Sequence, residues 1–224
     1  MDPKRIRQKV KEDYNQIAED FSSTRRHQWK DFQRFLPYLS KEDSILDLGC
    51  GNGRLLYFLM EVGFTSYLGL DQSNRLLEQA KKQFSEIKFE EADIASLENG
   101  QADKDVLFAI AAFHHLPPAD QLKALKAWKT HLKPEGHLIM TNWNLHQKKY
   151  RPALLKSALG SYGFRGCLIS WKNQLDRYYY AFTLRKLNRL LKAAGYKVLE
   201  NEYVSDAKSS SIWKAKNILT IAKK

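Results

Sequence analysis

Between Leu46 and Arg54 the chain reads LDLGCGNGR, an apolar stretch that runs into three glycines at alternate positions before an apolar segment of helical character. Glycine lets the backbone adopt positive φ and approach a bound ligand without a Cβ clash. Strand, glycine loop and helix in this order are typical of the first βα unit of α/β nucleotide-binding folds. The pattern therefore predicts a parallel sheet with a ligand at the carboxyl end of its first strand.

The spacing of the glycines narrows the class of ligand. Phosphate loops carry a Lys and a Ser or Thr after the glycines, or spread the glycines as GxGxxG. Here the spacing is GxGxG and no such lysine follows. Asp47 lies at the strand end, where a carboxylate repels phosphates and attracts the ammonium group of a cationic amino-acid ligand. A generic tight turn between strand and helix is the alternative interpretation.

Three further predicted strands end in polar groups. Asp71 closes the second, about twenty residues beyond the glycines, where a carboxylate accepts hydrogen bonds from ribose hydroxyls. The third, IKFEEADI, ends at Asp93 and Ile94, although Asp93 also fits a solvated acid after an edge strand. The fourth, DVLFAIAAFHHL, is apolar like a strand buried on both faces, and it ends at His114 and His115.

The glycine loop and these strand ends resemble the S-adenosylmethionine (SAM) site of class I methyltransferases. Asp71 alone leaves NAD open, because NAD sites use the same carboxylate. The resemblance implies a Rossmann-like α/β fold, with a seven-stranded mostly parallel sheet, an antiparallel C-terminal hairpin and helices on both faces. It places Asp93 beside the adenine amine and Ile94 against the adenine ring. The cofactor-binding residues it implies are Asp47, Gly49, Gly51, Gly53, Asp71, Gln72, Asp93, Ile94 and Ala111.

The periodicity of apolar residues predicts the remaining elements. We expect helices over 1–21, 29–39, 53–62, 73–84 and 118–132, and strands over 45–48, 66–70, 87–90, 105–112 and 136–142. Thr183 fits the N-cap of a further helix that ends at Gly195, followed by the hairpin YKVLENEYV and KNILTIAKK. The 224 residues, 43% of them hydrophobic, suit one domain. Within it, residues 1–40 form a helical cap over the pocket and residues 145–182 a basic insertion on the substrate side.

Positive charge is concentrated in the last third of the chain. Residues 144–224 hold 17 Lys and Arg against 4 Asp and Glu, whereas residues 40–143 hold 11 against 15. Between 144 and 199, 12 basic residues accompany a single acid, Asp176, and alternate with aromatic side chains. Arginine and aromatic planes together suit unstacked bases and phosphates, which favours RNA over a membrane surface. A lysine-rich surface that only maintains solubility is the alternative.

A narrower resemblance covers most of the chain in order. DYNQIAEDFSSTRRHQW, the glycine loop, AIAAFHHL and RYYYAF are similar to the tRNA wobble-uridine carboxymethyl methyltransferase family, which esterifies the carboxylate of a modified anticodon uridine. The chain departs from that pattern at Tyr180, where the family has His. The substrate-pocket residues that the resemblance implies are Thr24, Arg25, Arg26, His114, His115, Arg177, Tyr178 and Tyr179.

Transfer of a methyl group to a carboxylate needs positioning more than a strong base, because the carboxylate is ionised at neutral pH. The acceptor oxygen must lie in line behind the sulfonium methyl at roughly 3–3.5 Å. We therefore expect Arg25 to orient the carboxylate, and His115 to donate a hydrogen bond or to shape the pocket. The alternatives are that Arg25 or Arg26 contacts a phosphate and that His114 is a core histidine.

Other functions fit the sequence less well. A small-molecule O- or N-methyltransferase would share every SAM residue but not the basic insertion, and a non-catalytic RNA-binding protein would not need an intact glycine loop. No [DN]PP[YFW] motif follows the fourth strand, and the His and Cys spacings predict no metal site. We expect a cytoplasmic protein, because no apolar run approaches the ~20 residues of a membrane span and the N-terminus lacks the apolar segment of a signal peptide. We also expect a monomer. The resemblance also implies a small zinc-binding activator, which in the eukaryotic members docks on the third strand's edge. Here that edge reads IKFEE, which suits an edge left in water, so the edge does not support this partner.

Overall fold

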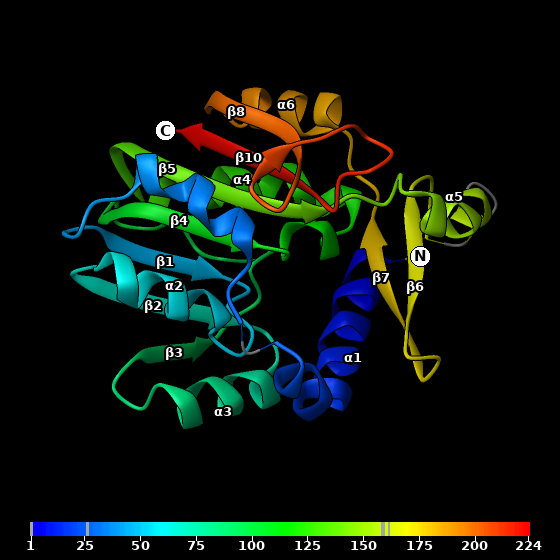
Figure 1. Cartoon of the computed structure of the whole chain (residues 1–224), viewed down its shortest axis with the longest axis horizontal. Coiled ribbons are helices and arrows are strands. Elements are labelled where there is room, and N and C mark those ends of the chain that lie inside the picture. The colour runs from blue at the N-terminus through cyan, green and yellow to red at the C-terminus, as the bar shows by residue number, and fades with distance from the viewer. Residues whose placement is uncertain (1, 26, 158–159, 161) are drawn as a thin grey trace.

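A computed structural model describes residues 2–25, 27–157, 160 and 162–224 (Figure 1). In these residues the main sheet has eight strands in the order β3-β2-β1-β4-β5-β10-β8-β9. Strands β1 to β5 run parallel, whereas β10 is antiparallel to both β5 and β8. The Rossmann-like sheet and its antiparallel C-terminal hairpin are confirmed. The strand beyond the seven that were predicted is β9, whose two residues pair with the end of β8.

The elements of the main body alternate along the chain as predicted. The strands are β1 (Ser44–Leu48), β2 (Ser66–Asp71), β3 (Lys88–Glu91), β4 (Lys104–Ile110), β5 (Leu132–Trp143), β8 (Lys197–Ser205), β9 (Lys208–Ser209) and β10 (Asn217–Lys223). The helices are α1 (Pro3–Ser23), α2 (Arg54–Val62), α3 (Asn74–Gln83), α4 (Pro118–His131) and α6 (Leu184–Ala193), with 3₁₀ helices η1 (Lys30–Tyr38) and η2 (Phe113–His115).

Each parallel strand sends alternate side chains into two separate cores. In β1, Ile45 packs in the core formed with η1, α2 and α3, whereas Leu46 packs in the core formed with α1, α4 and α6. Strand β4 follows the same rule, with Phe108 on the first side and Leu107 on the second. Alternation of this kind explains why the central strands are apolar throughout and why helices cover both faces.

Three differences from the sequence-based expectation have a structural cause, and the other element bounds shift by at most two residues. The segment 29–39 is a 3₁₀ helix rather than an α-helix, because Pro37 lacks an N–H and disfavours α geometry in the residue before it. Strand β4 ends at Ile110, since Ala111 turns the chain with φ of 53°. Strand β5 begins at Leu132, before the predicted start at 136, because Leu132 pairs with Lys104 ahead of a register shift.

The insertion has its own small sheet, which the sequence analysis did not predict. After η3 (Lys148–Tyr150) and α5 (Arg151–Ser157), strands β6 (Gly166–Trp171) and β7 (Leu175–Tyr180) form an antiparallel hairpin separate from the main sheet. In Figure 1 this hairpin lies beyond the carboxyl ends of the parallel strands, with α1 between it and the sheet. It contacts α1 through β7, so the insertion and the N-terminal helix together cover that end of the sheet.

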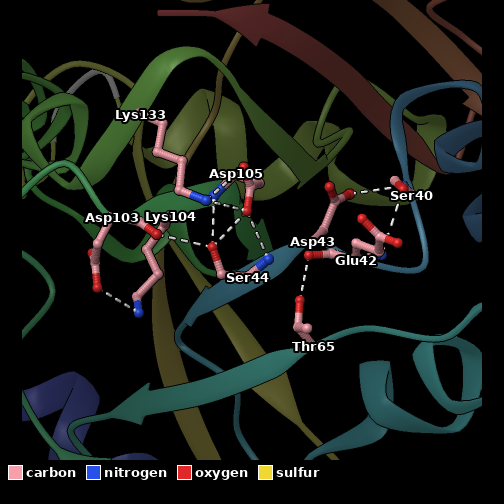
Figure 2. Close-up of polar contacts among 9 residues, drawn as sticks. All are labelled: Ser40, Glu42, Asp43, Ser44, Thr65, Asp103, Lys104, Asp105 and Lys133. Carbon is pink, nitrogen blue, oxygen red and sulfur yellow. Dashed lines mark hydrogen bonds and ion pairs between the residues drawn. The ribbon is translucent and has the colours of Figure 1, made fainter.

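At the opposite end of the sheet a polar network joins the starts of β1 and β4 (Figure 2). The Asp105 carboxylate accepts hydrogen bonds from the backbone N–H of Ser44 at 2.9 Å, from its Oγ at 2.6 Å and from Lys133 Nζ at 2.8 Å. Ser44 Oγ also lies 2.9 Å from the carbonyl of Asp103. These contacts fix the register of two central strands far from the cavity described next. Among the described helices, none has the length and apolar character that a membrane span requires.

Candidate active site

A cavity lies where the carboxyl ends of β1, β2 and β4 meet α1 and β7. It encloses about 1040 Å³, counting the space at its open mouth. The glycine loop and the three strand ends contribute one part of its lining, and α1, the chain around Arg25 and strand β7 contribute the rest. The helical cap and the insertion therefore both reach the place where a parallel α/β sheet holds its ligand.

The glycine loop wraps around the Asp71 carboxylate. Gly51 N–H donates to Asp71 Oδ2 and Ser73 N–H donates to Oδ1, both at 2.8 Å. Burial raises the pKa of Asp71 to about 6 even though these amides favour its charged form. A Cβ on Gly49, whose φ is 76°, would lie 2.5 Å from the Cβ of Ala112. The loop can therefore adopt this path only with glycine at position 49, and it fixes Asp71 as an acceptor facing the cavity.

Asp47 brings a second buried carboxylate to the cavity. Only 1% of its surface is exposed, and Tyr67 donates its hydroxyl to Oδ2 at 2.7 Å. Its other oxygen, Oδ1, is buried and has no hydrogen-bond partner among the described residues. Burial, assisted by the neighbouring Asp71, raises the pKa of Asp47 to about 7. An unpartnered buried carboxylate oxygen is costly, and a cationic amine in the cavity would satisfy it.

Four of the five remaining residues expected around a nucleoside line the cavity. Gln72, Asp93, Ile94 and Ala111 line the cavity, whereas Gly53, with φ of 78°, begins helix α2 outside the lining. The Asp93 carboxylate already forms an ion pair with Arg7, with Nε 2.9 Å from Oδ2, and accepts a hydrogen bond from the backbone N–H of Ala95 at 2.9 Å. Asp93 therefore reaches a ligand only together with Arg7, which the sequence analysis did not consider.

Three arginines converge on the other part of the cavity. Arg25, Arg54 and Arg177 all line it, and none of them forms an ion pair within the described residues. Burial and the charge of Arg177 lower the pKa of Arg25. Burial and the charge of Arg25 lower the pKa of Arg54 to about 9. These guanidinium groups repel one another in a partly dry environment, so a bound anion would stabilise the cluster.

Aromatic rings hold the arginines in place. The guanidinium of Arg54 lies 4.3 Å from the Trp29 ring centroid, and that of Arg25 lies 5.3 Å from the Phe21 ring and 5.4 Å from the Trp171 ring. Arg177, only 2% exposed, lies 4.6 Å from the same Trp171 ring. Cation–π contacts of this kind fix a guanidinium without neutralising its charge. The N–H groups of the three arginines therefore remain suited to an anionic ligand.

His115 is part of a relay of hydrogen bonds. Its Nδ1–H donates to the Tyr178 carbonyl at 2.7 Å, which leaves Nε2 to accept from the Tyr14 hydroxyl at 2.9 Å. Arg177 Nη1 donates to the same hydroxyl at 3.1 Å. Burial, reinforced by the Arg177 charge, lowers the pKa of His115 to about 3, so the ring is neutral. Both of its nitrogens are engaged, which favours a positioning role over donation to a substrate.

The chain matches one family over most of its length. The family described as "Methyltransferase domain" matches residues 21–201. The chain belongs to this methyltransferase family.

Curated relatives of this methyltransferase differ in how much of their length they share with it. A protein of Encephalitozoon cuniculi that bears a provisional methyltransferase name is 30% identical over 192 residues, 84% of this chain and 87% of that protein. The tRNA (carboxymethyluridine(34)-5-O)-methyltransferase of Schizosaccharomyces pombe is 26% identical over 220 residues, 86% and 90% respectively. The mouse enzyme of that activity, ALKBH8, is 29% identical over 136 residues, 60% of this chain, and the match spans only 20% of its length.

Solved structures share the fold of this methyltransferase. A SAM-dependent methyltransferase of Methanosarcina mazei superimposes with a TM-score of 0.71 at 21% identity, covering 84% of this chain and 95% of that one. A Haloferax volcanii methyltransferase, solved in complex with the Trm112 methyltransferase activator, gives a TM-score of 0.71 at 18% identity over 96% of both chains. At these identities the likeness establishes the fold of SAM-dependent methyltransferases.

Two predicted pocket residues of the methyltransferase point elsewhere. The side chain of Tyr178 lies in the core with Tyr162, because successive residues of β7 face opposite sides and Arg177 and Tyr179 take the cavity side. This corrects the expectation that Tyr178 lines the pocket, although its carbonyl holds His115. Thr24 Oγ1 instead donates to the Asp20 and Phe21 carbonyls at the end of α1. The prediction for Arg26 lies outside the described residues.

Other predicted residues lie at the cavity. His114 and His115 both line it, and the His114 ring stacks on Tyr179 with centroids 5.0 Å apart. The interpretation of His114 as a core histidine also fits. The His114 side chain is 1% exposed, and its Nδ1 accepts a hydrogen bond from the backbone N–H of Trp143 at 3.1 Å.

Sequence reasoning missed three groups at the cavity of this methyltransferase. Arg54 was quoted only as the end of the glycine loop, yet its guanidinium joins the arginine cluster. Tyr14 sits in the narrow family motif but received no role, and Arg7 lies earlier in the same helix. The helical spacing of Arg7 and Tyr14 on one face of α1 is the signal that could have placed them together.

Proposed function

We propose that this protein is a SAM-dependent methyltransferase that acts on tRNA and methyl-esterifies the carboxymethyl group of a modified wobble uridine. The observation that carries the proposal is the cluster of Arg25, Arg54 and Arg177 in the cavity, where no carboxylate of the described residues pairs with them. The full-length likeness to the Schizosaccharomyces pombe enzyme supports the same substrate.

The residues around the glycine loop fit the methyl donor. The free Oδ1 of Asp47 suits the ammonium group of SAM, and the amide-held carboxylate of Asp71 suits its ribose hydroxyls. Gly51 leaves open space on the cavity side, since a Cβ there would have only Leu76 within reach, at 4.0 Å. When bound, SAM supplies an electrophilic methyl group on a sulfonium. This chain's own residues hold the donor and keep its environment apolar around Ile94.

The arginine cluster would hold the acceptor carboxylate at the other side of the cavity. A guanidinium can bind one carboxylate oxygen or both, and Arg25 is the arginine we assign to orient the attacking group. A clamp that is too tight would stabilise the ground state and slow the transfer. The lowered pKa values of Arg25 and Arg54 reflect mutual repulsion and dehydration, which an incoming carboxylate relieves. The His115–Tyr14 relay keeps Arg177 in position for the same contact.

The proposed partners follow from the surface of the sheet. Strand β3 is the edge strand, and it exposes Lys88, Glu90 and Glu91. Charged side chains discourage pairing of a further strand at an edge. We therefore propose that this methyltransferase does not require a small activator protein at that edge. Addition of a purified Trm112-type protein should leave its turnover unchanged, and a severalfold gain in turnover would contradict this.

The substrate can be tested by labelling. The wild-type protein is incubated with radiolabelled SAM and either bulk tRNA or a small-molecule extract, and the labelled product is digested and identified. We expect a label in a carboxymethyl ester of a uridine in tRNA. Label confined to the extract would assign a small-molecule O- or N-methyltransferase instead. Absence of any SAM binding by calorimetry would assign a non-catalytic protein.

The roles of the pocket residues can be tested in the same assay. Arg25→Ala should lose most of its turnover and keep the wild-type thermal midpoint. His115→Ala should lose most of its turnover and also some stability, because the Tyr14 hydroxyl and the Tyr178 carbonyl lose their buried partner. Turnover is therefore measured at a temperature at which both variants are folded. Wild-type rates in both would contradict these roles. Arg75→Ala is the matched control, because Arg75 is exposed on α3 and pairs only with Glu78.

A further inference from the structure

An aromatic and cationic track leads from the cavity to the surface of the protein. We propose that Trp143, Tyr150, Arg151 and Trp213 form this track and bind a single-stranded stretch of RNA, so that nucleotides beside the reacting one are held outside the cavity. The inference deepens the proposed function, on which it rests for the position of the reacting nucleotide. Its binding test is independent of methyl transfer.

Ring contacts link the members of the track in two pairs, and adjacency in the chain joins the pairs. Trp143 lines the cavity and stacks on Tyr179, with centroids 5.1 Å apart and planes at 18°. On the outer side the Tyr150 ring lies 6.5 Å from Trp143 with planes at 22°. Arg151 follows Tyr150 in the chain, and its guanidinium lies 5.0 Å from the centroid of the Trp213 ring. Three flat side chains and one guanidinium thus connect the cavity with the exterior.

The outer end of the track is held rigidly. Asn144, fully buried next to Trp143, donates its side-chain N–H groups to the Ile212 carbonyl at 2.7 Å and to the Ala215 carbonyl at 2.9 Å. These bonds tie the loop that carries Trp213 to the carboxyl end of β5. The Trp213 side chain nevertheless remains 59% exposed. The ring is therefore presented to solvent on an ordered loop, where a base can stack on it.

Positive charge predominates around the track. Of the lysines counted next, Lys216 alone is paired within the described residues, with Asp206. Residues 144–157 contain four Lys and Arg and no Asp or Glu, and residues 207–217 contain three Lys and no acid. The exposed cations beside the rings include Lys149, whose Nζ lies 4.7 Å from the Tyr150 centroid. Aromatic faces that stack on bases, flanked by cations that contact phosphates, are the features of single-stranded nucleic-acid sites. Basic charge beside the open rings therefore favours RNA as the occupant.

The track can be tested by RNA binding in the absence of SAM. Fluorescence anisotropy with a labelled oligouridylate of about 8 nucleotides, within the site size of single-strand binding folds, gives the dissociation constant for each protein. Trp213→Ala should weaken binding about 5- to 150-fold, the range for removal of one stacked base. Trp213→Phe should restore most of it. Arg151→Gln should lower the slope of log K against log salt by roughly 0.7.

Matched variants separate the track from general effects. Met60 on α2 is 60% exposed, so Met60→Ala removes an equally exposed apolar side chain elsewhere and should change nothing. Equal affinity of Trp213→Ala and wild type would overturn the proposal. The proposal would also be overturned if Trp213→Ala left RNA binding unchanged but lost binding to vesicles of phosphatidylserine and phosphatidylcholine. That result would assign the surface to a membrane.

Failure of the proposed function has a different signature. If wild type binds the oligouridylate through Trp213 but transfers no methyl group to tRNA, the esterification proposal falls and the track stands. If wild type methylates tRNA and Trp213→Ala does so with unchanged KM and RNA affinity, the track alone falls.

Discussion

The Tyr14 hydroxyl donates to Nε2 of His115 at 2.9 Å, and this single contact joins the N-terminal helix to the end of the fourth strand. The same hydroxyl accepts from Arg177 at 3.1 Å. Tyr14 thus connects three elements that are remote in sequence: α1, η2 and β7. The hydrogen bond from Arg177 to Tyr14 and the cation–π contact of Arg177 with Trp171 together position this arginine in the cluster.

Tyr14→Phe should weaken both folding and turnover. The variant keeps the ring but leaves His115 Nε2 buried without a donor, which costs roughly 1–3 kcal/mol in the free energy of unfolding. It also frees Arg177, so turnover should fall more than SAM affinity. Thermal unfolding, calorimetry with SAM and the methyl-transfer assay measure the three effects. An unchanged thermal midpoint would contradict the relay.

Asp47→Asn should reduce SAM affinity without unfolding the protein. The amide can still accept from Tyr67, so the buried hydrogen bond at 2.7 Å is retained. The charge that attracts the ammonium group is lost, and a charge-assisted hydrogen bond is worth roughly 1.5–3 kcal/mol, or about 10- to 150-fold in affinity. Calorimetric titration with SAM gives the dissociation constant. Wild-type affinity in this variant would remove Asp47 from the donor site.

SAM affinity should rise with pH up to about 7. In the free protein, burial raises the pKa of Asp47 to about 7 and that of Asp71 to about 6, so both carboxyl groups carry protons at pH 5. A cation stabilises their charged forms, and binding therefore releases protons. The stability of the fold should change in the opposite direction, falling as pH rises. A carboxyl group whose pKa is raised on folding from 3.8 to about 7 lowers the free energy of unfolding as pH rises through that range.

Calorimetry in two buffers with different ionisation enthalpies, at about pH 6, counts the protons released on SAM binding. Asp47→Asn should release fewer protons than wild type. A SAM affinity that is flat between pH 5 and 8 would contradict the raised pKa values.

Arg54→Gln should lower turnover on a carboxylate substrate and keep or raise thermal stability. Arg54 is a half-buried cation without a carboxylate partner in the described residues, so its removal relieves part of a desolvation cost. Loss of one charge-assisted contact to substrate should reduce kcat/KM by about 10- to 150-fold. Arg75→Gln, on exposed α3, is the control for both measurements. A strongly lowered thermal midpoint would mean that Arg54 serves the fold.

Asp105→Ala, which removes both acceptor oxygens, should lower stability and leave turnover unchanged. Asp105 accepts from Ser44 and Lys133 at the end of the sheet opposite the cavity (Figure 2). The ion pair with Lys133 is partly exposed and contributes little, but the bonds from Ser44 join two central strands. We expect a loss of about 1–2 kcal/mol in the free energy of unfolding, measured with urea. A change in kcat/KM would show that this end of the sheet communicates with the cavity.

Local signals in the sequence were sufficient for the parallel sheet and for the part of the cavity that we propose binds the methyl donor. Glycine at position 49 is required by positive φ and by the 2.5 Å approach to Ala112, and strand ends such as Asp47 and Asp71 follow from short apolar runs. These features depend on residues close together in the chain, or on the rule that parallel strands align their carboxyl ends. A local pattern can therefore encode them completely.

The part of the cavity that we propose binds the acceptor was decided largely by tertiary structure. The family resemblance placed Arg25 and Arg177 in one pocket, but nothing in the local sequence places Arg54, which follows the glycine loop, beside them. Tyr178 was wrongly expected at the cavity for a related reason. The RYYY run does not reveal which of its residues face the cavity, because that depends on how the hairpin packs against α1. Contacts between distant segments arise from the packing of whole elements, and periodicity along one segment carries no record of them.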